Sequence, residues 1–225
     1  MKYLSPAFFK FFDELSQNNN KEWFDTNRDR YENDIKKPFR ALVEKLIEEL
    51  SKDLPEINLN PSKCIFRINR DIRFAKDKSP YKNNVAAVFN QKGTKDVDYP
   101  GFYIHIGQDE LMIGGGKYFC SKQDLEKIRQ EIYYNHSDFK KLINDKKFKS
   151  AFGELQGEKN KVLPPDYKAF EKTEPLIANK QFWFYKNLTR KEVLADDFDK
   201  VILAHFRSAL KMNNFLWETV SAWDN

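Results

Sequence analysis

Five basic and two acidic side chains stand close together between positions 67 and 81. The basic residues are Arg67, Arg70, Arg73, Lys76 and Lys78, and the acidic ones are Asp71 and Asp77. An arginine grips a phosphate or carboxylate through two parallel hydrogen bonds, and a lysine adds a compact positive charge. This density of cations predicts a site for a small anionic ligand that carries phosphate. The expected lining residues are Arg67, Arg70, Arg73, Lys78 and Tyr81.

The same stretch also shows the alternation that is typical of a β-strand. In an extended chain one face is apolar and carries Phe66, Ile68, Ile72 and Phe74. Arg70 also falls on this face, where an unpaired guanidinium is too costly to bury. We therefore expect a bulge at 70–71 or a dedicated partner for Arg70. On a strand, Arg67 and Arg73 lie roughly 20 Å apart, so an extended ligand fits better than one small phosphate.

Two interpretations of these charges remain open at this point. The arginines either converge on a bound anion, or form an internal network in which Asp71, Asp77 or distant glutamates hold Arg70 and Arg73. If the site is catalytic, the candidate proton carriers are Asp71, Asp77 and His105. Two carboxylates six positions apart are weak evidence for a metal, so no metal site and no cofactor are predicted.

Three consecutive glycines, 114–116, follow a predicted strand and precede Lys117. They imply a bulge, a positive backbone φ or the close approach of another group. The run lacks the spacing of a Walker phosphate loop. Its amides can nevertheless approach an anion, so Gly115, Gly116 and Lys117 join the candidate ligand site, with a purely structural role as the alternative. His105 is a general base only if it meets the basic stretch, and a structural histidine otherwise.

The basic stretch resembles the hallmark of a family of uncharacterised bacterial proteins, domain of unknown function 2461. That hallmark is Arg-x-x-Arg-Asp-x-Arg-Phe-x-x-Asp-Lys-x-Pro-Tyr. It is matched here by Arg67, Arg70, Asp71, Arg73, Phe74, Asp77, Lys78, Pro80 and Tyr81. The segments 19–24 and 114–118 are also similar to the family, and the resemblance covers the whole chain. The family has no established activity, so the resemblance implies no reaction.

Composition sets further limits on the function. The net charge of +5 is mild for a dedicated nucleic-acid binder, which makes nucleic acid a weaker candidate partner, alongside a protein partner. No apolar run approaches the roughly 18 residues of a membrane span, and no signal-peptide layout is present. Cys64 and Cys120 give neither a disulfide framework nor a metal spacing. We expect a reduced cytoplasmic protein that does not bind membranes.

The order of the expected elements indicates the fold class. Strands are expected in the middle of the chain, over 85–89, 101–106, 111–113 and 182–185. Helices are expected at both ends, with capping boxes at Ser121–Asp124 and Thr189–Glu192 and one long closing helix. This distribution favours a single α+β domain over residues 1–225. Its central, mainly antiparallel sheet would be covered by the N-terminal and C-terminal helices.

Overall fold

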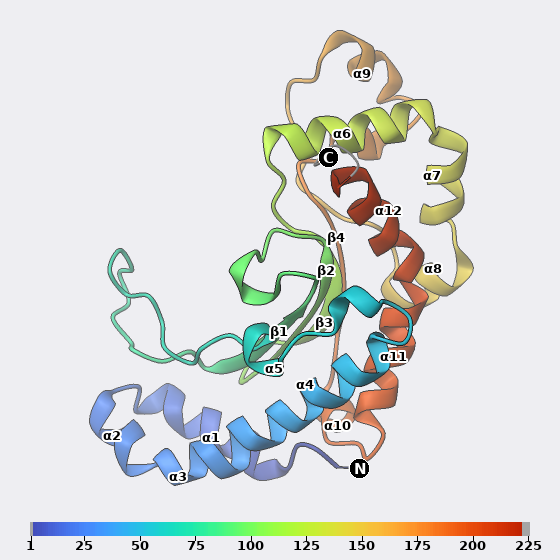
Figure 1. Ribbon diagram of the computed structural model, residues 1–225. Helices are drawn as coiled ribbons and strands as arrows, with labels where there is room; N and C mark the ends of the chain where they lie inside the picture. Colours follow the sequence, from blue (N-terminus) through green and yellow to red (C-terminus); the bar gives the residue numbers. More distant parts are fainter. Residues whose placement is uncertain (1, 222–225) are drawn as a thin grey trace. The chain divides into compact units, whose positions relative to one another are not determined.

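A computed structural model describes residues 2–221, and its architecture is α+β (Figure 1). Its sheet has four strands in the order β1-β2-β3-β4 and is antiparallel, which confirms the predicted fold class. The strands are β1 (Asn84–Phe89), β2 (Gly101–Gly107), β3 (Leu111–Lys117) and β4 (Phe182–Asn187). β2 and β3 form a hairpin, in which the Gly107 amide donates to the Glu110 carbonyl at 2.9 Å.

The chain forms two compact units. The first comprises residues 1–95, 103–113 and 187–203, and the second comprises residues 96–102, 114–186 and 204–225. β2 and β3 each contribute residues to both units. A single domain over the whole chain therefore remains a prediction, and each unit is described by itself below.

The first unit carries the N-terminal helices. They are α1 (Pro6–Gln17), α2 (Lys21–Thr26), α3 (Arg28–Arg30), the π-helical turn η1 (Tyr31–Lys36), α4 (Lys37–Leu50), the 3-10 turn η2 (Pro55–Ile57) and α5 (Pro61–Cys64). Pro6 stands in the first turn of α1, and the Asn20 side chain caps α2 by accepting from the Trp23 amide. α4 begins at Lys37 directly after the π-helical turn, and Pro38 stands in its first turn. α4 and α5 pack against β1.

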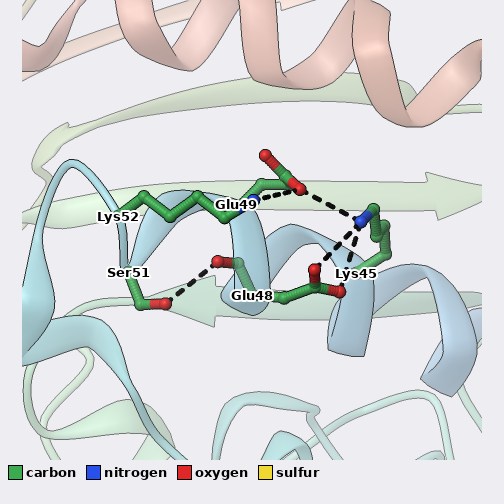
Figure 2. A network of polar contacts seen from close by, with 5 residues as sticks. All are labelled: Lys45, Glu48, Glu49, Ser51 and Lys52. Carbon is green, nitrogen blue, oxygen red and sulfur yellow. Dashed lines mark hydrogen bonds and ion pairs between the residues drawn. The ribbon is translucent and has the colours of Figure 1, made fainter.

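One face of α4 is polar at its C-terminal end, as Figure 2 shows. The ammonium of Lys45 lies 3.2 Å from a Glu48 carboxylate oxygen and 3.0 Å from Glu49, and Lys52 lies 2.7 Å from Glu49. Hydrogen bonds from Lys52 and then Lys45 lower the pKa of Glu49 to about 2. The opposite face of the helix is buried through Leu42, Leu46 and Leu50. This amphipathic pattern fixes which side of α4 faces the core.

The second unit carries most of the later helices. They are α6 (Lys122–Tyr134), α7 (His136–Ile143), α8 (Lys146–Phe152), α9 (Pro165–Phe170), the 3-10 turn η4 (Pro175–Ala178) and α12 (Leu210–Ser221). The predicted capping box of Ser121 and Asp124 is present at the start of α6. α11 (Phe198–Ser208) runs from the first unit into the second, and its Phe206 ring stacks on Phe102 of β2 at 4.5 Å. The C-terminal helices thus cover part of the sheet.

The prediction of one long closing helix is wrong. Thr189 and Glu192 do form a capping box, but it starts only the short α10 (Arg190–Val193). A second interruption separates α11 from α12, where the Ser208 hydroxyl donates to the His205 carbonyl at 2.6 Å. The Ala209 amide bonds to Phe206, three residues back, at 3.0 Å. These local bonds compete with the regular helical pattern and end the helix.

Each outer strand of the sheet is partly covered by an irregular segment. Along β1, Ile65 forms an antiparallel bridge with Ala87, and the Phe66 amide donates to the Ala86 carbonyl at 3.0 Å. Along β4, Gln156 and Trp183 exchange two backbone hydrogen bonds of 2.8 and 3.1 Å. Where these segments bond to β1 and β4, the backbone N–H and C=O groups of the strands are not available to pair with another protein molecule. No helix within residues 2–221 is long and apolar enough to cross a membrane.

Candidate functional site

Residues 67–81, called the motif loop below, form an irregular loop rather than a strand. It is the long teal loop in Figure 1. Its two arms meet at an isolated bridge between Asn69 and Tyr81, beside a 2.9 Å hydrogen bond from the Arg70 amide to the Pro80 carbonyl. The predicted strand over 66–74 is therefore wrong. The face that was expected to be apolar is not buried along its length, because Ile68 is 8% exposed whereas Phe74 is 95% exposed.

The outer part of the motif loop is held by its own ion pairs. Arg70 pairs with Asp77, which confirms the expectation of a dedicated partner. Arg73 bonds Asp71 through Nε at 3.0 Å and Nη2 at 2.7 Å. The Lys78 ammonium donates to the Ile72 carbonyl at 2.9 Å. These arginines satisfy the loop's own carboxylates, as the internal-network interpretation expects.

These pairs also affect the two aspartates as candidate proton carriers. Hydrogen bonds from Arg73 lower the pKa of Asp71. The pKa of Asp77 is held far below its usual range by hydrogen bonds from Ser79, and then by Arg70. A carboxylate that is so strongly favoured in its charged form is a weak base. The geometry therefore gives Asp71 and Asp77 a loop-holding role.

Tyr81 anchors the inner end of the motif loop. Its ring is 7% exposed and stacks on Phe24, with the ring centroids 3.9 Å apart. The Asn19 side chain grips the Tyr81 backbone in both directions, donating to its carbonyl at 3.0 Å and accepting from its amide at 3.1 Å. The side chain that was predicted to line the ligand site is thus packed in the core of the first unit.

Arg67, the first residue of the motif loop, and Lys82, the residue that follows it, have no carboxylate partner of their own among the described residues. Within residues 2–221, neither side chain makes a hydrogen bond or an ion pair. The Lys82 ammonium lies over the Phe66 ring, 5.4 Å from its centroid. Burial lowers the pKa of Lys82, and the charge of Arg67 lowers it further, so the two cations repel each other. Arg67 also contributes to the lowered pKa of Asp71.

Tyr103 and His105 of β2 complete this group. The Phe66 and Tyr103 rings meet edge to face with centroids 6.3 Å apart, and the Tyr103 hydroxyl lies 3.2 Å from His105 Nδ1. We call Phe66, Arg67, Lys82, Tyr103 and His105 the base cluster. Lys82 was not singled out from the sequence, because it lies just outside the 67–81 stretch of clustered charges. His105 is linked to the residues on either side of the motif loop through Tyr103, which meets Phe66, and through the charge of Lys82, so its role as a general base stays a prediction.

The electrostatics of His105 favour a neutral imidazole at pH 7. Burial lowers its pKa below the ordinary value, Glu110 partly opposes this, and Lys82 adds to it. The second ring nitrogen, Nε2, lies 3.9 Å from a Glu110 carboxylate oxygen. Burial raises the pKa of Tyr103 to about 12, so its hydroxyl stays protonated. A hydrogen on Nε2 would face Glu110, and the Tyr103 hydroxyl would then donate to Nδ1.

The predicted ligand residues Gly115, Gly116 and Lys117 belong to the second unit, where they lie in β3. Gly116 has φ +104°, and a Cβ there would stand 2.2 Å from the Phe182 carbonyl oxygen, so both the predicted positive φ and the predicted close approach are confirmed. The Gly116 amide donates to Asn213 at 3.1 Å. The Lys117 ammonium bonds the Asp98 carbonyl at 2.7 Å and lies 3.1 Å from Asp124. The Gly116 amide and the Lys117 ammonium are therefore already bonded to groups of the protein itself.

A surface cleft of about 320 Å³, which was not predicted, lies between α1 and α10 in the first unit. Arg190 lies over the Phe9 ring at 4.6 Å and bonds Asp13 at 2.9 and 3.1 Å. Lys10 and Glu14 also line the cleft, with the Lys10 ammonium 4.0 Å from a Glu14 carboxylate oxygen. Because its arginine is already paired with a carboxylate, the cleft suits an anion less well than the base cluster does.

Neither metal nor thiol chemistry has a clear site in the described part of the chain. Residues 2–221 contain no group of three or more His, Cys, Asp or Glu side chains placed to hold a metal ion. Burial raises the pKa of both Cys64 and Cys120 to about 11, which disfavours the reactive thiolate.

Comparison with known proteins gives a family. No curated protein matches this chain. The sequence profile of the conserved hypothetical proteins DUF2461 matches residues 7–215, nearly the full length. The chain therefore belongs to this family of conserved hypothetical proteins.

Proposed function

We propose that this protein binds an anionic, phosphate-bearing ligand at the base cluster. The observation that carries the proposal is the pair of cations, Arg67 and Lys82, which lack a carboxylate partner within residues 2–221 and repel each other. The charge of Arg67 disfavours the charged form of Lys82, and a bound anion would offset that repulsion. The site is therefore narrower than the sequence suggested and lies at the inner end of the motif loop.

The neighbouring groups suggest how such a ligand would be held. The Arg67 guanidinium has the geometry for two parallel hydrogen bonds to a phosphate, and Lys82 adds a point charge. Phe66 and Tyr103 offer apolar ring surface beside these charges. His105 is the one candidate proton carrier that we retain, because its imidazole is neutral at pH 7 and lies within the electrostatic reach of Lys82.

Replacing Arg67 with glutamine is expected to weaken pyrophosphate binding about 10- to 100-fold, since a hydrogen bond to a charged group contributes roughly 1.5–3 kcal/mol. Isothermal titration calorimetry measures this directly. Arg73→Gln is the matched control, because it removes the same charge from the same loop but from a guanidinium that Asp71 already holds. Equal losses in the two variants would mean that only the loop's net charge matters, and would contradict the proposed site.

The lowered pKa of His105 gives a second expected result, with sulfate as a probe that keeps its double charge across the tested range. Below the ordinary histidine pKa of about 6.5, protonation adds a third positive charge to the base cluster. Sulfate should therefore bind more tightly as the pH falls from about 7 to 5, and His105→Gln should flatten this profile. A variant with the wild-type pH profile would exclude His105 from the site.

The same shift affects stability in the opposite direction. A histidine whose folded-state pKa lies below its unfolded value favours folding most when it is neutral. This contribution is present above about pH 6.5 and is lost as the pH falls toward the folded-state pKa. Sulfate affinity and stability of the free protein should thus move in opposite directions on acidification, which separates a ligand effect from simple unfolding.

A further inference from the structure

The most exposed large apolar side chain among the described residues stands at the tip of the motif loop. Phe74 is 95% exposed, and the Arg73 guanidinium lies over its ring, 5.9 Å from the centroid. Leaving a phenylalanine in water forfeits roughly 1.5–3 kcal/mol relative to burying it. The loop nevertheless presents this ring on a backbone that is held by several polar bonds.

Those bonds fix the tip from both sides. Asp71 accepts from the Arg73 side chain and also from its amide at 3.2 Å. Asp77 pairs with Arg70 and accepts from the Ser79 amide at 2.8 Å. These hydrogen bonds already restrict the loop backbone, so binding would have to remove little further conformational freedom. The Phe74 ring is therefore preorganised for a contact.

The motif loop therefore has a cation–aromatic pair at each end. Lys82 lies over Phe66 at the inner end, and Arg73 lies over Phe74 at the tip. Lys76 and Lys78 are exposed beside the tip. Both aspartates of the motif loop are already paired with arginines, so the tip carries a positive excess. A ligand that repeats a negative charge and a flat ring along its length matches this arrangement.

We propose that the motif loop binds single-stranded nucleic acid, with a base stacked on Phe74 and the phosphates near Arg67, Lys82 and the tip lysines. This inference rests on the proposed function, because it names the substrate class of the anion site. Base–aromatic stacking tolerates any base, and cationic side chains along the strand supply the rest of the affinity. A membrane surface is less well matched, since only one large apolar side chain is fully exposed at the tip.

Fluorescence anisotropy with a labelled oligothymidylate of about twelve nucleotides tests this inference. Phe74→Ala is expected to weaken binding about 5- to 100-fold, from the usual contribution of one stacked base. Arg67→Gln should weaken binding and reduce the slope of log affinity against log salt by about 0.7. Tyr134→Ala is the matched control, because it removes another exposed ring, 76% exposed, from the second unit. It should bind like the wild type.

Several outcomes would overturn the inference. The first is an unchanged affinity in Phe74→Ala, and the second is equal binding of an abasic strand of the same length. The third is no oligonucleotide binding at all while pyrophosphate still binds in an Arg67-dependent way, which would leave the proposed function standing. If pyrophosphate binding also fails, both proposals fall. Phe74-dependent binding to anionic phospholipid vesicles without oligonucleotide binding would replace nucleic acid with a lipid surface.

Discussion

Alanine in place of Gly116 is expected to lower the free energy of unfolding by about 3 kcal/mol or more. Gly116 has φ +104°, which side-chain-bearing residues adopt only at a cost of roughly 1–3 kcal/mol. The new Cβ would also stand 2.2 Å from the Phe182 carbonyl oxygen, so β4 would have to move away from β3. Equilibrium urea denaturation, followed by circular dichroism, measures the loss.

Gly153 supplies the matched control within the same unit. It also has a positive φ, +77°, but a Cβ there would meet no atom within 4 Å. Gly153→Ala should therefore show the backbone strain alone, roughly 1–3 kcal/mol, and lose less stability than Gly116→Ala. If the two variants lost the same stability, the close approach of β3 and β4 would contribute nothing, and the structural reason given for the glycine run would be wrong.

Tyr81→Ala is expected to destabilise the protein by about 3–5 kcal/mol, the usual cost of removing a large buried aromatic ring. The ring is 7% exposed and stacks on Phe24, so its loss leaves a cavity under the motif loop. The Asn19 bonds to the Tyr81 backbone would remain, but their support would be lost. Thermal and urea unfolding of the variant give the magnitude.

Tyr81→Phe separates the anchoring role from the ligand role that the sequence suggested. The Tyr81 hydroxyl makes no hydrogen bond within residues 2–221, so its removal should change stability by less than about 0.5 kcal/mol. Pyrophosphate affinity should also be unchanged. A stable Tyr81→Phe protein with weakened pyrophosphate binding would instead show that the hydroxyl touches the ligand.

The regular parts of the fold could be predicted from the sequence because their signals are local. Alternating apolar residues located β2, and an unbroken apolar run located β1. Ser121 and Asp124 located the start of α6 for the same reason, since both partners of a capping box lie within one helical turn. The glycine run gave its positive φ and its close approach, although not the identity of the neighbouring strand.

The motif loop shows where such reasoning stops. Its alternation was that of a strand, but Asp71 and Asp77 each bond a backbone amide two residues further on. Side chains of this kind offer the backbone an alternative to a sheet ladder, and here they win. The sequence also could not show which arginines are paired with a carboxylate. Arg67 and Arg73 are the same residue type in the same stretch, and only the folded loop places Asp71 against Arg73.

The segment that covers the edge of β1 also connects the motif loop to the tendency of the protein to aggregate. Ile65 and Phe66 bond to β1 immediately before the motif loop begins, so the same segment leads into the loop and shields a strand edge. An open strand edge is a template for pairing with another molecule. Selection acting on this stretch would therefore preserve solubility as well as recognition, and damage to the loop's anchor would favour aggregation even where no ligand is present.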